Sequence, residues 1–242
     1  MHIDNNYLVL DDNDIIQDKK IKGHSFVELL GMNRFKKTGD ALLTQCGLLP
    51  TDEIDKKWLL RGDFAEKLVK LTYEKKGRKC TTYNKKIIKY DNFHDNKDFG
   101  GLIDIELLEE KTLIEVKSKS IKDFDFITKR QPDSEINQGM LYAFLRGYAD
   151  FIMEWIFFDE ITEAEICAGL KPANLSNLKR ISKVYKVDYE LMIGYMDICL
   201  EKIDDFKKNR KIHLQYISDE ALDKLGLLNK NINIDDLGWL DD

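Results

Sequence analysis

The sequence has few cysteines, few prolines and no long apolar run. Its four cysteines stand far apart and include no Cys-x-x-Cys pair, which excludes the usual patterns of a structural zinc site or a short disulfide framework. We expect four reduced and mostly buried thiols. No apolar run approaches the roughly 20 residues of a membrane-spanning helix, and the N-terminus lacks the basic-then-apolar order of a signal peptide. We therefore expect a cytoplasmic protein that does not enter a membrane.

The composition is that of a folded soluble domain. Hydrophobic residues make up 43% and charged residues 34% of the 242 positions, which is typical of globular proteins. This length favours a single domain over residues 1–242. We divide it into a helical N-terminal segment (1–50), a core (51–160) and a C-terminal helical part (161–242).

The net charge of -6 argues against a protein that coats nucleic acid without specificity. Local charge differs from that average, because residues 67–89 hold nine basic residues against one acid, Glu74. Such a run is often only a solvated helix face and loop. Alternatively, the run creates a local positive field that attracts a polyanion such as nucleic acid.

The three prolines, Pro50, Pro132 and Pro172, mark boundaries between predicted elements. The periodicity predicts two short helices broken at Gly31 and ended near Gly47, and then a long helix ended at Gly77. Six further elements are predicted from their patterns: extended pieces over 80–90, 102–108 and 112–118, a helix over 133–147, an apolar strand over 150–159, and a long helix over 186–211. This order predicts an α/β (α+β) layered domain.

The segment "LIDIELLEEKTLIEVKS" carries three charged groups that a simple hairpin does not need. If its two halves pair antiparallel around a tight turn at Glu109 and Glu110, Asp104 lies opposite Glu115. Opposed residues point to the same face. Lys117 shares that face with Glu115 because strand side chains alternate. The three groups therefore converge on one patch.

Two close carboxylates repel each other unless a cation lies between them. Oxygen donors of this kind suit Mg²⁺ (or Mn²⁺), and the carbonyl of Val116 would complete the set. Such an ion stabilises charge on a phosphoryl group, and Lys117 beside it would orient or help deprotonate the attacking water. The alternative is a hairpin whose charges simply face solvent.

Asp104, a gap and then Glu115-Val116-Lys117 resemble the core motif of the PD-(D/E)XK nucleases. That motif alone is frequent by chance, but two flanking helices extend the resemblance. "RGDFAEKL" is similar to the Gly-x-x-x-Glu helix of the lambda-exonuclease and RecB types, with Glu66 as the acid. "INQGMLYAF" is similar to their Gln-x-x-x-Tyr helix, with Gln138 and Tyr142 at i and i+4 on one face.

The N-terminal segment 23–49 resembles the helical start of the phage-recombinase (lambda exonuclease, YqaJ-type) exonucleases. In that family this region helps to hold a DNA end and its 5′-phosphate. Ser25 matches a serine of the family, and Lys22 and Arg34 are nearby cations suited to a phosphate.

The resemblance implies a restriction-endonuclease-like core, in which a central mixed β-sheet is flanked by helices, and an Mg²⁺- or Mn²⁺-dependent deoxyribonuclease. It implies a 5′-to-3′ exonuclease that acts on double-stranded DNA ends in phage or prophage recombination. A single-strand annealing protein would be a partner, and a homotrimer is expected.

The resemblance also assigns roles to individual residues. Asp104, Glu115 and the carbonyl of Val116 would hold the ion, which Glu66 would contact directly or through water. Lys117 would position the attacking water, and Gln138 would orient Lys117 or the scissile phosphate.

The chain also departs from the phage pattern. It has "GGLID" where phage exonucleases usually have a "PDG" turn, and this arrangement is more usual among RecB-type nucleases. Some of those carry an iron–sulfur cluster on four cysteines, three of them close together near the C-terminus. Cys167 and Cys199 have no such neighbours, so we expect no cluster.

Two other functions stay open. A restriction or defence endonuclease would use the same ions, but it needs a specificity element for which this chain leaves little room. A non-catalytic DNA-binding protein on a nuclease fold usually lacks an acid or the lysine of the motif, and here Asp104, Glu115 and Lys117 are all present.

Overall fold

A four-stranded mixed sheet lies at the centre of the core. The computed structural model describes residues 1–51, 53–173, 175 and 178–228. The strands are ordered β5-β6-β7-β8, with bounds Ile105–Leu107, Thr112–Ser120, Asp150–Phe158 and Lys179–Lys186. The long central pair β6 and β7 is parallel, and the two outer pairings are antiparallel. Helices α4 (Phe124–Lys129) and α5 (Asp133–Arg146) form the crossover from β6 to β7.

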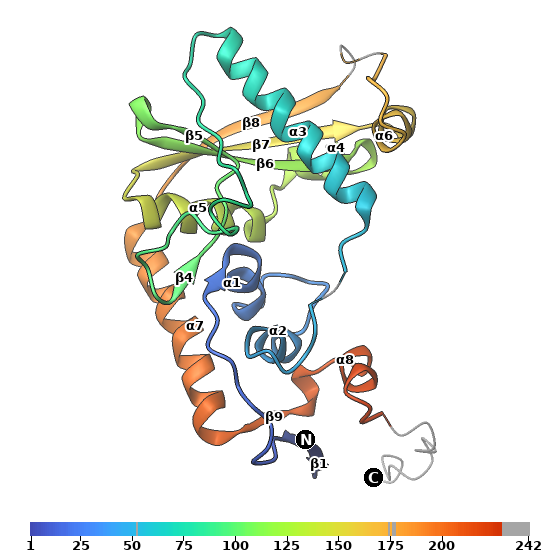
Figure 1. Ribbon diagram of the computed structural model, residues 1–242, viewed down its shortest axis with the longest axis vertical. Coiled ribbons are helices and arrows are strands. Elements are labelled where there is room, and N and C mark those ends of the chain that lie inside the picture. The colour runs from blue at the N-terminus through green and yellow to red at the C-terminus, as the bar shows by residue number, and fades with distance from the viewer. Residues whose placement is uncertain (52, 174, 176–177, 229–242) are drawn as a thin grey trace.

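Helices cover both faces of this sheet (Figure 1). Helix α3 (Lys56–Lys75) packs its buried Ala65 and Val69 against Ile114 and Val116 of β6. Because side chains alternate along a strand, the next residues of β6 face the opposite layer. That layer is formed by α5 together with α1 (Gly23–Leu29) and α7 (Tyr189–Asn209). Glu115 and Lys117 therefore point away from α3.

The two ends of the described chain meet in a smaller sheet below the core (Figure 1). Its strands are β1, β2 and β9, with bounds His2–Asp4, Tyr7–Val9 and Lys211–His213. A short parallel pair is formed by β3 (Ile21–Lys22) and β4 (Phe99–Gly100). The remaining helices are α2 (Thr38–Gln45), α6 (Glu160–Cys167) and α8 (Asp219–Lys224). Within the described residues no helix is long and apolar enough to cross a membrane.

The predicted fold class is confirmed, as are the predicted helices. Helix α3 begins at Lys56, because the Asp55 side chain accepts a hydrogen bond from the Lys57 amide and caps the helix. Gly147 ends α5 with φ of 69°, a left-handed conformation that glycine adopts without strain. Trp58, in the first turn of α3, is 43% exposed.

The hairpin register is confirmed, since Ile105 pairs with Ile114 and Leu107 with Thr112. The first strand is shorter than predicted, because β5 begins only at Ile105. Just before it, the Asp104 side chain, rather than a backbone carbonyl, accepts the Val116 amide hydrogen bond at 2.8 Å. The backbone pairing of β5 with β6 therefore ends at the position where the Asp104 carboxylate accepts the Val116 amide.

The extended piece predicted over 80–90 is wrong. Only an isolated bridge between Thr81 and Glu106 forms, and turns follow it. The Asn84 side chain accepts hydrogen bonds from the amides of Lys86 and Ile87, which favours a turn over a strand. Strands also occur where only helices were predicted, at β8 and β9 in the C-terminal part and at β1 to β3 in the N-terminal segment.

Candidate active site

The candidate site lies on β6 at the point where β5 stops. Asp104 is brought next to Val116 by the hydrogen bond from the Val116 amide to its Oδ2, at 2.8 Å. The register that continues from Ile105 and Ile114 places Asp104 opposite Glu115. The predicted convergence of the two acids on one face is therefore present.

Glu115 is 2% exposed, and its two oxygens have different surroundings. Oε1 accepts a hydrogen bond from Lys117 Nζ at 2.8 Å. Oε2 is buried and has no hydrogen-bond partner among the described residues. A buried carboxylate oxygen without a donor is costly, so this atom marks a position for a cation or another donor.

A polar chain joins Glu115 to α5. Lys117 Nζ also donates to Gln138 Oε1 at 2.9 Å, and Gln138 Nε2 donates to Tyr142 Oη at 3.4 Å. Gln138 and Tyr142 lie one helical turn apart, so α5 presents both to the same face of β6. The structure brings these four predicted site residues together.

The electrostatics of the cluster favour a bound cation. Burial, and then the charges of Glu115 and Glu66, raise the pKa of Asp104 well above its usual range. Burial also raises the pKa of Glu115. Burial alone would lower the pKa of Lys117, but Glu115 and Asp104 outweigh it and raise that pKa. Lys117 is therefore protonated, and one lysine is shared by two acids.

Glu66 approaches the cluster from α3, on the other side of the sheet. Its Oε1 accepts from Lys85 Nζ at 3.2 Å. Burial raises its pKa, Lys85 opposes that effect, and Asp63 and Glu115 add to it. In the part of the chain that the structure describes, no group of three or more His, Cys, Asp or Glu side chains is close enough to hold a metal ion. Glu66 is thus a neighbour of the pair formed by Asp104 and Glu115 rather than a third member of one set.

The residues present nonetheless fit a hard divalent cation. Mg²⁺ binds through one or two carboxylates and keeps several waters, so it does not need three acids. Asp104 and Glu115 supply two carboxylates, and Glu115 Oε2 has no donor of its own.

The N-terminal segment forms one wall of the site through α1. A Cβ added at Gly23 would lie 2.4 Å from Tyr142 Oη and 2.6 Å from Gln138 Cγ. Only glycine therefore permits this close approach. Lys22 and Ser25 flank that contact; Lys22 Nζ donates to the Tyr90 carbonyl at 3.4 Å.

Arg34, the third predicted phosphate ligand, lies in the α1–α2 loop. Its guanidinium lies over the ring of Phe35. Ser25 Oγ instead contacts His24 Nε2, at 3.4 Å. Lys22, Ser25 and Arg34 therefore remain predicted phosphate ligands.

Several residues near the site were not predicted. Lys119 follows Lys117 on the same face of β6 and pairs with Glu135, which also accepts from Trp155 Nε1 at 2.6 Å. Burial lowers the pKa of His24 on α1, and Lys117 is among the charges that act on it. The alternation of Glu115, Lys117 and Lys119 was the available sequence signal for Lys119.

The basic run is partly neutralised within the fold. Arg78 pairs with Glu110, Lys79 with Glu109, and Lys85 with Asp63 and Glu66. The other exposed lysines of this run make no ion pair with any described residue: Lys67, Lys75, Lys76, Lys86 and Lys89.

The chain resembles known proteins in its three-dimensional structure. No protein-family model matches the chain, and no curated protein matches it. A phage-related exonuclease from Haemophilus somnus 129PT superimposes with a TM-score of 0.55 over 79% of this chain and 96% of that chain, at 13% sequence identity. The chain has the fold of this exonuclease.

Two structures of LHK-Exo, an alkaline exonuclease from Laribacter hongkongensis, were also found. Its complex with dAMP has a TM-score of 0.50, with 13% identity over 84% of this chain and 94% of that chain. The second LHK-Exo structure covers the same shares at 13% identity with a TM-score of 0.49. At these identities the similarity establishes the fold alone, and it agrees with the PD-(D/E)XK fold expected from the motif.

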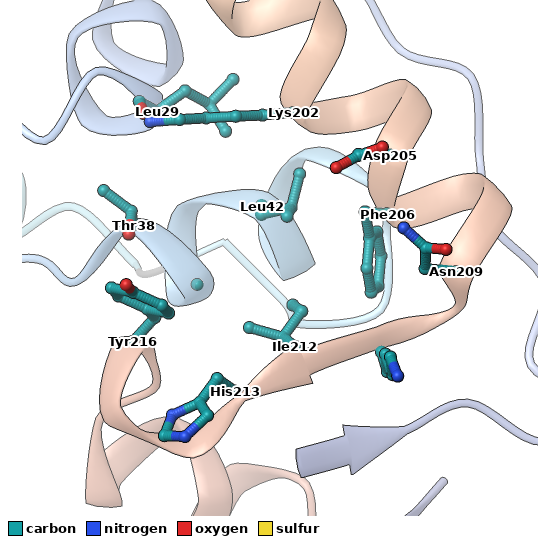
Figure 2. A pocket seen from close by; sticks show the side chains of 12 residues that line it. Leu29, Thr38, Leu42, Lys202, Asp205, Phe206, Asn209, Ile212, His213 and Tyr216 are labelled. Atoms are coloured by element: carbon teal, nitrogen blue, oxygen red, sulfur yellow. Dashed lines mark hydrogen bonds between the residues drawn. The ribbon is translucent and has the colours of Figure 1, made fainter. Parts of the chain in front are cut away.

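A cavity of about 490 Å³ lies away from this cluster, between α2, α7 and β9 (Figure 2). Its floor is apolar, with Leu42, Phe206 and Ile212, and His213 and Tyr216 stand at its edge. None of the predicted site residues lines it. The candidate site on β6 therefore does not coincide with this cavity.

Proposed function

We propose that the protein is a metal-dependent deoxyribonuclease that removes nucleotides from the ends of double-stranded DNA, in the 5′-to-3′ direction. The observation that carries this proposal is the pair of half-buried Asp104 and buried Glu115, with an unpartnered Glu115 Oε2 beside a protonated Lys117. The similar structures, a phage-related exonuclease and an alkaline exonuclease in complex with dAMP, support it.

Asp104, Glu115 and the Val116 carbonyl would hold Mg²⁺ or Mn²⁺. When bound, the ion supplies Lewis acidity toward the scissile phosphate and its attacking water. Glu66 lies close enough to influence the charge of Asp104, and we assign it an indirect role through water.

Lys117 would orient the attacking water and offset negative charge on the phosphoryl oxygens. Glu115 and Gln138 fix its ammonium group at 2.8 and 2.9 Å. Because its pKa is raised, this lysine acts as a hydrogen-bond donor rather than as a general base. Gln138 is then the residue that positions Lys117, and Tyr142 buttresses Gln138.

The DNA end would enter beside α1. Lys22 and Ser25 lie at the start of that helix, next to Gln138 and Tyr142, and are suited to a terminal 5′-phosphate. Arg34 is suited to a phosphate further along the strand. The exposed lysines of the 67–89 run would follow the backbone, which makes the affinity depend strongly on salt.

The biological setting is phage or prophage recombination in a bacterial cytoplasm. We propose a single-strand annealing protein as partner and a homotrimer as the assembly. A neighbouring gene for an annealing protein would support this setting.

The test is digestion of linear and covalently closed circular duplex DNA by the pure protein with Mg²⁺, repeated with Mn²⁺. Loss of linear DNA with intact circles is expected. Cleavage of circles would instead identify a restriction or defence endonuclease, and no hydrolysis of any DNA would leave a non-catalytic DNA-binding protein.

A matched pair of variants tests the site. Glu115→Gln should abolish digestion, whereas Glu109→Gln in the turn of the same hairpin should not, because Glu109 is 71% exposed and pairs only with Lys79 among the described residues. Equal activity of the two variants would reject the assignment.

A further inference from the structure

Two phenylalanine rings from distant parts of the chain are exposed near each other. Phe35, in the α1–α2 loop, is 83% exposed, and Phe126, in α4, is 53% exposed. Arg34 connects them: its guanidinium carbon lies 4.6 Å from the centroid of the Phe35 ring and 5.9 Å from that of Phe126. We call Arg34, Phe35 and Phe126 the aromatic platform.

The fold does not use these rings for its own stability. Neither ring belongs to the two hydrophobic clusters of the core. Burying a phenylalanine is strongly favourable, so two exposed rings held together by one arginine indicate a surface that binds something.

Two segments of the chain connect the candidate site to the aromatic platform. Strand β6 runs from Glu115 through Lys117 and Lys119 to its end at Ser120, and α4 with Phe126 follows after a short turn. In Figure 1, β6 leads toward α4 at the side of the sheet opposite the hairpin. Helix α1, whose start touches Gln138 and Tyr142, leads into the loop that carries the other two members.

The charge of the loop fits a nucleic acid. Residues 33–37 read Asn-Arg-Phe-Lys-Lys. Arg34 has no carboxylate partner among the described residues, whereas Lys36 pairs with Glu28 and Lys37 donates to the Ile217 carbonyl. A ring flanked by an arginine is the combination that stacks the bases of single-stranded nucleic acid.

We propose that the aromatic platform stacks an unpaired base at the end of the DNA. The ligand class is the nucleobase of a single-stranded terminal nucleotide, and this inference rests on the proposed function. Phe35 and Phe126 supply the apolar faces, and Arg34 holds them and attracts the adjacent phosphate. The enzyme therefore favours ends that are already frayed or carry a short overhang over fully paired ends.

The experiment uses a duplex whose terminal unpaired base is 2-aminopurine, on a short 5′ overhang in one substrate and a short 3′ overhang in another. Ca²⁺ replaces Mg²⁺ so that binding is measured without hydrolysis. Fluorescence anisotropy gives the affinity, and stacking quenches the 2-aminopurine. The variants are Phe35→Ala, Phe126→Ala and the ring-preserving Phe35→Trp, with Ile161→Ala, 75% exposed on α6, as the control.

Each alanine variant should bind the overhang roughly 5- to 100-fold more weakly, the usual effect of removing one stacked ring, and lose the quench. Phe35→Trp and Ile161→Ala should behave as wild type. Wild-type affinity and quench in both alanine variants, on both substrates, would overturn the inference, as would a Phe35-dependent self-association with no change in DNA binding. Ring-dependent quenching by a protein that digests no DNA would retain the stacking site and reject the nuclease.

Discussion

Replacing Asp104 by asparagine should stabilise the folded chain in EDTA and abolish DNA hydrolysis. In the absence of a cation the Asp104 carboxylate is buried near Glu115 and Glu66, and these raise its pKa. Asparagine keeps an oxygen for the Val116 amide, which donates to Asp104 at 2.8 Å, but it removes the negative charge. The substitution therefore removes repulsion without removing the hydrogen bond.

The size of this stabilisation follows from the coupling energy between residues of one charge network, which is typically about 0.5–3 kcal/mol. For a chain of this length that gives an increase in melting temperature of about 1–12 °C. The direction in which stability changes with pH is also defined. Because the folded pKa of Asp104 is raised above its ordinary value of 3.8, the wild type has no penalty below that pH and loses stability as the pH rises through the folded pKa. The advantage of the variant should therefore grow with pH.

Thermal unfolding in EDTA at several pH values, repeated with Mg²⁺, measures both effects. At a hundred times its dissociation constant, Mg²⁺ should raise the free energy of unfolding of the wild type by about 2.7 kcal/mol and should therefore raise its melting temperature. The variant should gain much less. Lys117→Met is the opposite control. It leaves the buried Glu115 without its cation, so it should destabilise by up to about 3–5 kcal/mol. A destabilised Asp104→Asn variant in EDTA would refute the account of a repulsive pair.

Two further predictions concern packing and DNA binding. Gly23→Ala should destabilise the folded protein by about 1–3 kcal/mol, since the new Cβ would lie 2.4 Å from Tyr142 Oη. The control is Gly194→Ala in α7, where a Cβ would have nothing within 4 Å, and it should stabilise the protein by up to about 1 kcal/mol. Equal melting temperatures of the two variants would contradict the close contact at Gly23. Changing Lys67 and Lys76 to glutamine should reduce the magnitude of the slope of log affinity against log salt by about 1 for each lost phosphate contact. An unchanged slope in filter-binding measurements would show that neither lysine contacts DNA.

The part of the site that could be predicted from the sequence is the part set by periodicity. Alternation along β6 fixes Glu115 and Lys117 on one face, and the turn length fixes Asp104 opposite Glu115. Helical spacing likewise places Gln138 and Tyr142 together. These relations depend only on local geometry, so they hold before the tertiary structure is known.

The rest depends on contacts between distant segments. The Asn84 side chain diverts residues after 83 into turns, and Lys85 then reaches back to Glu66 on α3. Strand β8 was missed because it is an edge strand rich in lysine, and lysine hides the apolar alternation that predicts a strand. The pairing of β2 with β9 joins the two ends of the described chain, and no local pattern indicates such a contact.

The most direct test of the central claim is nucleotide release from an end-labelled linear duplex by wild type and by Glu115→Gln, with DNA affinity measured in parallel in Ca²⁺. We expect Mg²⁺-dependent release by the wild type, and no release by the variant, whose affinity for DNA is retained. Release by Glu115→Gln at the wild-type rate would show that the hydrolysis does not occur at this cluster.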